Sequence, residues 1–219
     1  MIAKLNEGIA RLELSLSPQQ MEQLESYIGC ILECNKTYNL MKADSPDELA
    51  VNHILDSLAG LPTLLSLVSE HEMQTDGTVT IGDIGSGGGC PGIPLAIACP
   101  QFSFVLVERM EKRAKFLEQT VSNLGLTNTT VLCVQASAVP VHSFDFAVFR
   151  AFHPFEKKIL NWLFKMLKPE GFIIAYKARA EKIAAEMEAV RQIVPDYTKI
   201  PLTVPFLEDH ERHLVVIHR

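Results

Sequence analysis

The sequence predicts an α/β protein in which a doubly wound sheet follows a helical N-terminal part. From residue 78 onward, short apolar runs alternate with segments whose apolar residues recur at helical spacing, a pattern typical of alternating strands and helices. The first of these runs, 79–84, ends in a glycine cluster, as expected where a strand passes into a helix. The last two runs have no helical segment between them, so we expect an antiparallel hairpin at one edge of the sheet.

The N-terminal part contains clear helix start signals. Ser17-Pro18-Gln19-Gln20 has the order of an N-cap, a first-turn proline and a capping-box partner, and apolar residues at helical spacing follow it. Ser45-Pro46-Asp47-Glu48 is a second start signal, and its helix is expected to pass His53 and Asp56 towards Gly60. The remaining pieces expected here are a short helix at 62–68 and a polar linker at 69–77.

The rest of the chain supplies the sheet and the helices that cover it. Strands are expected at 79–84, 102–107, 130–134, 144–149, 172–176, 198–204 and 214–218. Helices are expected at 92–99, 110–124, 156–167 and 181–193, and Gly125 is a typical helix stop after the second of these. We therefore divide the chain into an N-terminal helical cap, residues 1–75, and a sheet domain, residues 76–219.

Length and composition exclude several classes of protein. The chain has 219 residues, of which 47% are hydrophobic and 21% charged, so it can build a core and is not a disordered chain. The longest nearly apolar run, 58–68, contains Pro62 and is shorter than the ~20 residues that span a bilayer as a helix. The N-terminus carries charges where a signal peptide needs an apolar stretch. We therefore expect a cytoplasmic protein with no membrane partner.

The cysteines and charges limit the possible partners. Five scattered cysteines form no CxxC pair, so we expect reduced core thiols and no metal site. The net charge is −6, but residues 1–108 carry four Lys and Arg against 14 Asp and Glu, whereas residues 109–219 carry 16 against 12. A polyanion would have to bind a local patch built largely from the second part. The alternative is that this asymmetry only reflects a solvated surface.

The glycine cluster is the strongest functional signal. A dinucleotide fingerprint GxGxxG that starts at Gly85 fails because Cys90 stands at its third glycine, whereas Asp-x-Gly-x-Gly-x-Gly fits from Asp83. A carboxylate ahead of the glycines suits a ligand with a cationic amine rather than a pyrophosphate. Glu108 ends the next strand, where a carboxylate can accept two hydrogen bonds from ribose hydroxyls. The alternative is a glycine-rich turn that binds nothing.

This combination resembles a class I (Rossmann-like) S-adenosylmethionine-dependent methyltransferase, and further segments narrow the resemblance. They follow in order from about residue 35 to the C-terminus: Tyr38-Asn39-Leu40, His53 with Asp56-Ser57-Leu58, the loop DIGSGGGCPGIPLAIA, Lys112-Arg113 with Phe116-Leu117, Phe144-Asp145, Arg150-Ala151-Phe152, Lys177 and Glu211-Arg212-His213-Leu214-Val215-Val216-Ile217. The chain thus resembles the bacterial RsmG family, also called glucose-inhibited division protein B. The loop and the RHLVVI ending are its most specific parts.

The resemblance implies an enzyme that methylates N7 of a guanine in 16S rRNA, with S-adenosyl-L-methionine as the cofactor. The cofactor-binding residues that it implies are Asp83, Gly85, Ser86, Gly87, Gly89, Cys90, Glu108, Ala136, Ser137 and Arg150. The catalytic residues that it implies are Arg150, Lys177 and Arg212. The expected partner is 16S rRNA, alone or in a ribosomal small-subunit particle, and the expected state is a monomer.

The chain departs from the family pattern at three places. Gln135-Ala136-Ser137 replaces a basic residue followed by a small-acidic pair, so an acidic hydrogen bond to the adenine amino group is lost, although backbone contacts to the adenine can persist. Phe149 precedes Arg150 where the family has Ser, and Ala178 follows Lys177 where Gly is usual.

The reaction requires little of the protein beyond alignment. Guanine N7 has an available lone pair and no proton to lose, so direct displacement needs no general base. The residues after the fourth strand lack the Asp/Asn-Pro-Pro-Tyr of exocyclic-amine methyltransferases, and Cys90 lies in the cofactor loop, away from the place of a nucleophile.

The roles of individual side chains stay open at this stage. Arg150 can contact the cofactor carboxylate, guanine O6 or a phosphate, and Lys177 and Arg212 are either phosphate ligands or ordinary solvated charges. His53 and Asp56 lie three apart on one helix face, where they couple to each other, cap the cofactor site or are simply buried. Lys112, Arg113 and Lys115 form either an RNA-binding patch or simply the solvent-exposed face of their helix. Phe152 and Phe155 either stack on an unpaired base or pack in the core.

Two other functions compete with the leading one. A methyltransferase acting on a small molecule or a protein would fit the net charge better, and a non-catalytic RNA-binding or regulatory protein would fit the changed Gln135-Ala136-Ser137 segment. Cofactor titration by calorimetry separates the last of these from the two enzymes.

Overall fold

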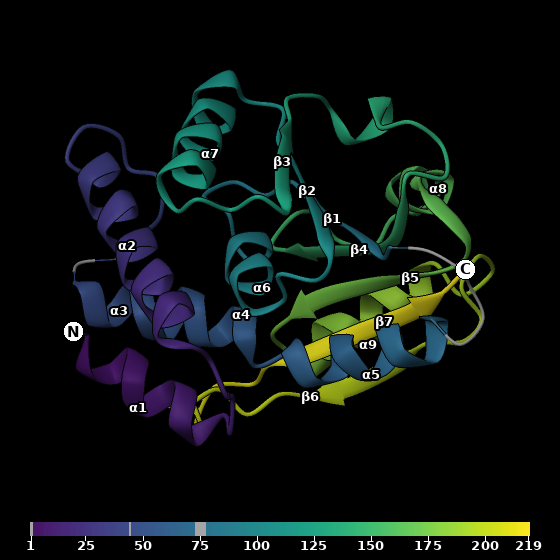
Figure 1. Ribbon diagram of the computed structural model, residues 1–219. Helices are drawn as coiled ribbons and strands as arrows, with labels where there is room; N and C mark the ends of the chain where they lie inside the picture. Colours follow the sequence, from purple (N-terminus) through teal and green to yellow (C-terminus); the bar gives the residue numbers. More distant parts are fainter. Residues whose placement is uncertain (1, 44, 73–77) are drawn as a thin grey trace.

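The computed structural model describes residues 2–43, 45–72 and 78–219, and a seven-stranded sheet forms its centre (Figure 1). The strand order is β3-β2-β1-β4-β5-β7-β6. The strands are β1 (Thr80–Ile84), β2 (Ser103–Val107), β3 (Thr129–Leu132), β4 (Phe144–Arg150), β5 (Leu167–Lys177), β6 (Thr198–Pro201) and β7 (His213–His218). β1 to β5 pair in parallel, and β7 pairs antiparallel with β5 and β6. The doubly wound sheet and its antiparallel edge hairpin are thus confirmed.

Helices flank the sheet on both faces. They are α1 (Ala3–Arg11), α2 (Pro18–Asn35), α3 (Pro46–Leu49), α4 (Asp56–Leu58), α5 (Leu61–Glu72), α6 (Gly92–Ala98), α7 (Glu111–Asn123), α8 (Lys157–Met166) and α9 (Ala180–Ala189). A π-helical stretch, Ala50–Leu55, links α3 to α4, and a short 3-10 turn covers Ala136–Ala138. The predicted capping box is present, since the Ser17 hydroxyl accepts from the Gln20 N–H and the Gln20 side chain accepts from the Ser17 N–H.

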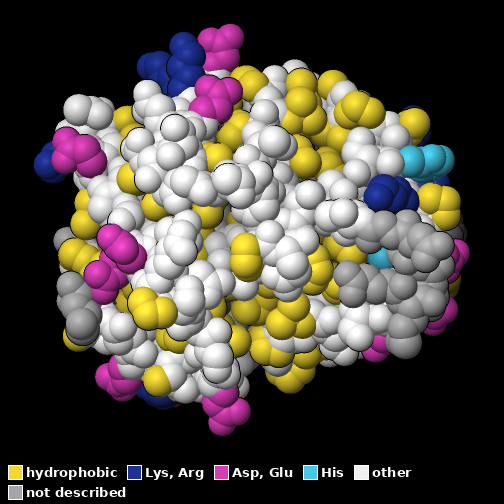
Figure 2. Space-filling model, viewed as in Figure 1, with side chains coloured by type: hydrophobic (Ala, Val, Ile, Leu, Met, Phe, Trp, Pro, Cys, Tyr) yellow, Lys and Arg dark blue, Asp and Glu magenta, His cyan; other side chains and the backbone are white. Residues whose placement is uncertain are grey.

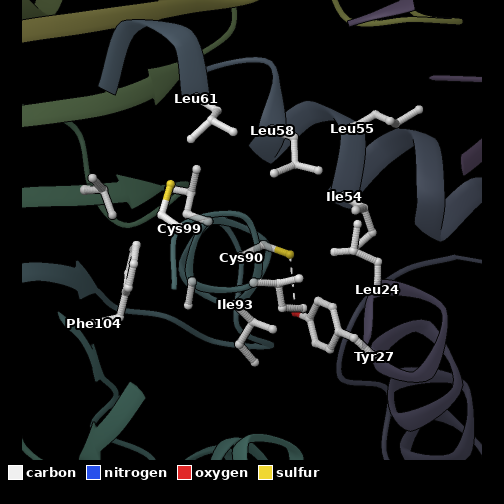
Figure 3. Packing of buried hydrophobic residues seen from close by; sticks show 14 of the residues in the cluster. Leu24, Tyr27, Ile54, Leu55, Leu58, Leu61, Cys90, Ile93, Cys99 and Phe104 are labelled. Carbon is white, nitrogen blue, oxygen red and sulfur yellow. Dashed lines mark hydrogen bonds between the residues drawn. The ribbon is translucent and has the colours of Figure 1, made fainter. Parts of the chain in front are cut away.

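Alternating side chains along the strands divide the core into two layers. Phe146 and Val148 of β4 pack with residues of α1 to α7 on one face, whereas Ala147 and Phe149 pack with α8 and α9 on the other. Figure 3 shows a section of the first layer, where Leu24 and Tyr27 of α2 meet Cys90 and neighbouring apolar residues. The N-terminal helices therefore share one continuous core with the sheet.

The structure corrects two expectations for the N-terminal part. Helix α1 has no counterpart among the expected elements, because its short sequence lacks a side-chain cap at Ile2. The linker expected at 69–77 is wrong for 69–72, which continue α5; residues 73–77 lie outside the described residues. The helix continues there because Val68 and His71 are buried.

One helical segment is long and apolar enough to cross a membrane by length and composition. This segment, Pro46–His71, has 56% of its most apolar window buried inside the protein, and Ile54, Leu58 and Leu64 lie in the first core layer. A core helix passes the same test of length and composition, so the finding carries little weight.

Candidate functional site

The loop between β1 and α6 is held by backbone and side-chain hydrogen bonds at the carboxyl end of the strands. The N–H groups of Gly85 and Ser86 both donate to the Val107 carbonyl of β2, at 2.9 and 3.0 Å. Asp83 Oδ2 accepts from the Ser86 hydroxyl at 2.6 Å and from the Gly92 N–H at 3.0 Å. Asp83 thus organises its own loop, a role in addition to the amine contact expected from the sequence.

Asp83 is buried, and burial raises its pKa to about 6, against the lowering effect of the bonds from Ser86 and Gly92. Its other oxygen, Oδ1, is also buried and has no hydrogen-bond partner among the described residues. A buried carboxylate oxygen without a donor is costly, so this atom is suited to a ligand or a water that donates.

Glu108 follows β2 and points back to the same loop. Its Oε2 accepts from the Gly87 N–H and its Oε1 from the Met110 N–H, both at 2.9 Å, and the side chain is buried. A carboxylate has about four acceptor sites, so two remain for hydroxyl groups of a ligand.

A cavity of about 270 Å³ lies beside this loop and is called the smaller cavity here. The residues that line it are Gly85, Val107, Glu108, Arg109, Met110, Arg113, Val134, Gln135, Ala136, Ser137, Ala151, Phe152, His153 and Trp162. Four of the expected cofactor residues, Gly85, Glu108, Ala136 and Ser137, are therefore together in its wall. Asp83, Ser86, Gly87 and Gly89 belong to the same loop but do not line this cavity, and Arg150 lines a different one.

Cys90 lies in the apolar core rather than in that wall. Its sulfur lies 3.3 Å from the Tyr27 hydroxyl, which also donates to the Gly88 carbonyl at 2.6 Å (Figure 3). The contact attaches α2 to the glycine loop, so Cys90 and Tyr27 fix the loop from behind. Burial raises the pKa of the Cys90 thiol, which keeps it neutral.

A larger cavity of about 520 Å³ brings the three expected catalytic residues together. It is lined by Asn52, His53, Asp56, Phe149, Arg150, Ala151, Phe152, His153, Pro154, Tyr176, Lys177, Ala178, Leu202, Arg212 and His213. Arg150 ends β4, Lys177 ends β5, and Arg212 immediately precedes β7, so the sheet order places all three at one end of adjacent strands.

Asp56 connects two of these cations. Arg150 Nη1 donates to Asp56 Oδ2 at 2.7 Å, and Arg212 Nε donates to Asp56 Oδ1 at 2.8 Å. Arg150 also donates to the Asn52 carbonyl at 2.9 Å and to His53 Nδ1 at 2.7 Å. His53 and Asp56 thus both contact Arg150 and line the larger cavity; Asp56 is buried and His53 is half-buried with a partner on each ring nitrogen, which is nearest to the interpretation of a buried, hydrogen-bonded histidine.

The hydrogen bonds of His53 fix its neutral form. Because a guanidinium only donates, Nδ1 accepts from Arg150, and because a carbonyl only accepts, Nε2 carries the proton toward the Lys42 oxygen at 3.4 Å. Burial and the Arg150 charge together lower the pKa of His53 to about 4.

Lys177 is paired rather than free. Its Nζ lies 2.6 Å from Glu186 Oε2 and 4.5 Å from the centre of the Phe155 ring, and only 14% of its side chain is exposed. Phe155 itself is buried, which confirms core packing for that residue. Lys177 is therefore held against the edge of the larger cavity by α9.

The two cavities share Ala151, Phe152 and His153, the segment that follows β4. Ala151 has φ +53, and the half-buried Phe152 ring lies where a Cβ on Gly85 would be. A molecule in one cavity and a molecule in the other would therefore meet at this segment. The sequence contains no signal for this shared wall, because the wall depends on the conformation of the turn that follows β4.

The basic residues of α7 separate into two environments. Arg113 lines the smaller cavity, whereas Lys112 and Lys115 are exposed beside Tyr38 in a groove between α2 and α7. Figure 2 shows that lysine and arginine side chains are sparse on the face in view and that some of them lie over α7 at the top. No surface on this face is strongly basic.

The smaller cavity fits a nucleoside-type methyl donor on two observations. Glu108 has acceptor sites left for ribose hydroxyls, and Gly85 has no Cβ at the point where the backbone borders the cavity. In the adjoining loop, Asp83 Oδ1 has no donor among the described residues.

Sequence comparison identifies close relatives. The family model described as rRNA small subunit methyltransferase G matches residues 20–215. The ribosomal RNA small subunit methyltransferase G of Cupriavidus necator is 37% identical over 225 residues, covering 99% of this chain and 94% of the relative. The protein of the same name from Klebsiella pneumoniae is 37% identical over 218 residues, covering 99% of this chain and 98% of the relative.

Solved structures share the fold at low sequence identity. The tRNA (m1A58) methyltransferase TrmI from Aquifex aeolicus has a TM-score of 0.57 at 14% identity and covers 89% of this chain and 75% of that one. The [4+2]-cyclase SpnF also has a TM-score of 0.57, at 15% identity over 94% of this chain and 97% of its own. Because one of these is named as a cyclase, the likeness shows the fold and not the reaction. The sequence comparisons do more: the chain belongs to the rRNA small subunit methyltransferase G family, a family of S-adenosylmethionine-dependent methyltransferases.

Proposed function

We propose that this chain transfers the methyl group of S-adenosylmethionine to N7 of a guanine in 16S rRNA. The observation that supports this most directly is the pair of cavities that meet at Ala151, Phe152 and His153. The smaller cavity, beside Glu108 and the glycine loop, suits the cofactor. The larger one, with its arginines, suits a nucleotide with carbonyl and phosphate oxygens.

The cofactor would be held by the loop and by the ends of β1 to β3. Glu108 would accept from the ribose hydroxyls, and Asp83 from the cationic amine, while Ala136 and Ser137 would border the adenine with their backbone. When bound, the cofactor supplies an electrophilic methyl group on a sulfonium. Cys90 and Tyr27 would keep the loop in place from behind.

The larger cavity supports a reaction without a general base. Both oxygens of Asp56 accept hydrogen bonds from arginines, and Nδ1 of His53 accepts from Arg150. Asp56 is therefore held in two ion pairs, and the one acceptor nitrogen of neutral His53 is occupied, so neither group is free to take a substrate proton; guanine N7 also has no proton to remove. The residues would act by orienting the base against the methyl group, which accounts for large rate effects in well-aligned reactions.

Three cations and one ring would position the nucleotide. Arg150 stands nearest the shared wall and would donate to guanine O6 or to a phosphate, and it cannot donate to N7 because that lone pair attacks. Lys177 and Arg212 would contact phosphate oxygens at the rim. Phe152, half-buried between the cavities, would stack on the extruded base.

The remaining parts of the proposal concern the cap and the partner. The N-terminal cap, residues 1–75, would cover one face of the methyltransferase domain, residues 76–219, and supply Asn52, His53 and Asp56 to the nucleotide side. The substrate would be 16S rRNA alone or within a small-subunit particle. A monomer in the cytoplasm suits that role.

The proposal is tested by mapping N7-methylguanine in 16S rRNA from cells with the gene, without it, and with an Arg150→Ala copy. We expect one N7-methylated guanine that disappears on deletion and is strongly reduced with Arg150→Ala. Purified chain with naked 16S rRNA and with small-subunit particles then identifies the preferred substrate. An unchanged N7-methylguanine pattern after deletion, or methyl found on an exocyclic amine, would refute the assignment.

A further inference from the structure

Asp56 is buried between two arginines that come from distant parts of the chain. Its side chain is 6% exposed, and its oxygens accept from Arg150 at 2.7 Å and from Arg212 at 2.8 Å. A buried carboxylate is costly unless it is paired and hydrogen-bonded, and here both oxygens are paired. One carboxylate faces two guanidinium groups, so this cluster of three side chains keeps a net positive charge beside the larger cavity.

The arginines keep donors for another molecule. A guanidinium has five N–H donors, and Arg150 uses three of them, on Asp56, Asn52 and His53. Arg212 uses its Nε on Asp56 and an Nη1 donor on the Glu211 carbonyl. Side-chain exposures of 17% for Arg150 and 27% for Arg212 leave part of each group open to the cavity that both of them line.

We propose that Asp56 is a positioning residue that holds Arg150 and Arg212 as one rigid pair, whose open donors bind oxygens of the target nucleotide. The proposal rests on the function proposed above. It adds a role for Asp56, which holds the two arginines in an arrangement that neither arginine could keep alone. Two guanidinium groups repel each other, so without the carboxylate they would separate into solvent. A pair held at fixed spacing is already arranged for its acceptors, which lowers the cost of ordering it during the reaction.

His53 supports the same arrangement from the other side. Its Nδ1 accepts from Arg150 Nη2, and the Arg150 charge together with burial keeps the ring neutral, so it adds an acceptor and no third positive charge. Arg150 is thus fixed by three partners within the segment 52–56, which includes most of the π-helical stretch.

Asp56→Asn is the informative variant because it keeps the size of the side chain but has one acceptor and one donor group. The asparagine can accept from one arginine while its N–H group faces the other, so the substitution breaks the pair without leaving empty space in the protein. Asp145→Asn is the matched control. Asp145 is also a buried carboxylate, paired with Lys168 at 2.8 Å, but it lies at the opposite end of β4, away from both cavities.

Three measurements on the full-length variants test the role: kcat and KM for methylation of small-subunit particles, the S-adenosylmethionine Kd by calorimetry, and the thermal midpoint. We expect Asp56→Asn to lower kcat by about tenfold or more while the cofactor Kd stays within about twofold of the parent value. Asp145→Asn should lower the midpoint but keep kcat. The double variant Asp56→Asn, Arg150→Ala should be little worse than Arg150→Ala alone, because both changes break one unit.

A kcat for Asp56→Asn equal to the parent value, or a fall no larger than that of Asp145→Asn, would overturn the proposal. Hydrogen exchange of arginine Nε–H groups by NMR gives a readout that does not depend on catalysis. We expect the Arg212 Nε–H to be protected in the parent and unprotected in Asp56→Ala, which leaves no side-chain acceptor for either arginine, and an unprotected parent would overturn the rigid pair. A parent that protects this group but methylates no guanine N7 would instead refute the proposed function, and with it the role of the pair.

Discussion

At Gly85, both the backbone conformation and the crowding around the residue require a glycine. Its φ of +72 is strained for any residue with a Cβ, and that Cβ would collide with the Phe152 ring. We expect Gly85→Ala to weaken S-adenosylmethionine binding severely and Gly85→Asp to abolish it, because a carboxylate would also enter the smaller cavity. Isothermal titration calorimetry measures both.

Gly125 supplies the control for this prediction. It has a similar φ of +63, but a Cβ there would meet nothing within 4 Å, and it follows α7 outside both cavities. Gly125→Ala should therefore cost stability through strain alone, on the order of 1–2 kcal/mol, and leave cofactor affinity unchanged. Equal Kd values for folded Gly85→Asp and the parent would show that the loop does not hold the cofactor.

His53 gives a prediction about pH. Its ordinary pKa of 6.5 falls to about 4 in the folded protein because of burial and the Arg150 charge, so the unfolded chain binds this proton first as the pH drops. The free energy of unfolding should therefore decrease from about pH 6.5 down to about pH 4, by up to about 3 kcal/mol from this residue, and level off below.

Many carboxylates titrate in the same range, so the comparison is with His53→Asn, whose amide oxygen can accept from Arg150 without titrating. The difference in unfolding free energy between parent and variant, from urea melts at several pH values, should shrink as the pH falls through this window. A difference that stays constant from pH 7 to pH 4 would contradict the lowered pKa of His53.

The elements of the sheet domain were predictable from the sequence because local signals and tertiary packing agree there. The apolar runs bounded by glycine and charge fall on β1 to β7, although β5 begins at Leu167, where the end of a helix was expected, and β6 ends at Pro201 rather than at 204; the Ser17 capping box and the Ser45 cap are formed as expected. The site was only partly predictable. The spacing of His53 and Asp56 indicated one helix face, but their shared contact to Arg150 joins segments separated by more than 90 residues. The π-helical stretch, which contains His53 and ends just before Asp56, is a rare conformation that the sequence pattern did not indicate.

The N-terminal helices lead to a prediction at the scale of elements. Removing residues before Thr78 would expose the apolar face of β4, β5 and β7 and would remove the Tyr27 contact to Gly88 together with Asp56. We expect such a fragment either to aggregate or to bind cofactor without methylating RNA. Light scattering, calorimetry and a methylation assay distinguish these outcomes.

A chain that lacks only α1 is the control. It loses the buried residues Leu5 and Ile9 but keeps Tyr27, His53 and Asp56, so it should be less stable and still methylate RNA. Full methylation by the fragment that starts at Thr78 would show that the cap is dispensable for the reaction.

At the scale of the whole molecule, a protein of net charge −6 has to bind a polyanion through few contacts. The cations predicted from the sequence are also partly compensated by carboxylates, since Lys177 is paired with Glu186 and Arg150 and Arg212 share Asp56, which leaves one positive charge among the three. Figure 2 shows acidic side chains scattered over the face in view. Affinity for naked RNA should therefore be weak, and the assembled particle would have to add contacts that RNA alone does not offer.

This charge distribution predicts a shallow salt dependence. Each phosphate contact contributes about −0.7 to −0.9 to the slope of log affinity against log salt concentration, so two or three contacts give a slope of about −2. Lys177→Ala and Arg212→Ala should lower methylation but change the slope by less than one contact each, because a phosphate would have to share each cation with a carboxylate. Arg150→Ala should reduce turnover more than affinity.

The double variant Lys112→Ala, Lys115→Ala tests the exposed face of α7. If these lysines contact phosphates, each lost contact would flatten the salt slope by the amount of one phosphate contact. Filter binding at several salt concentrations measures these slopes. A parent slope steeper than about −4, or a slope that changes when cations within residues 1–108 are replaced, would contradict a small RNA-binding surface built from residues 109–219.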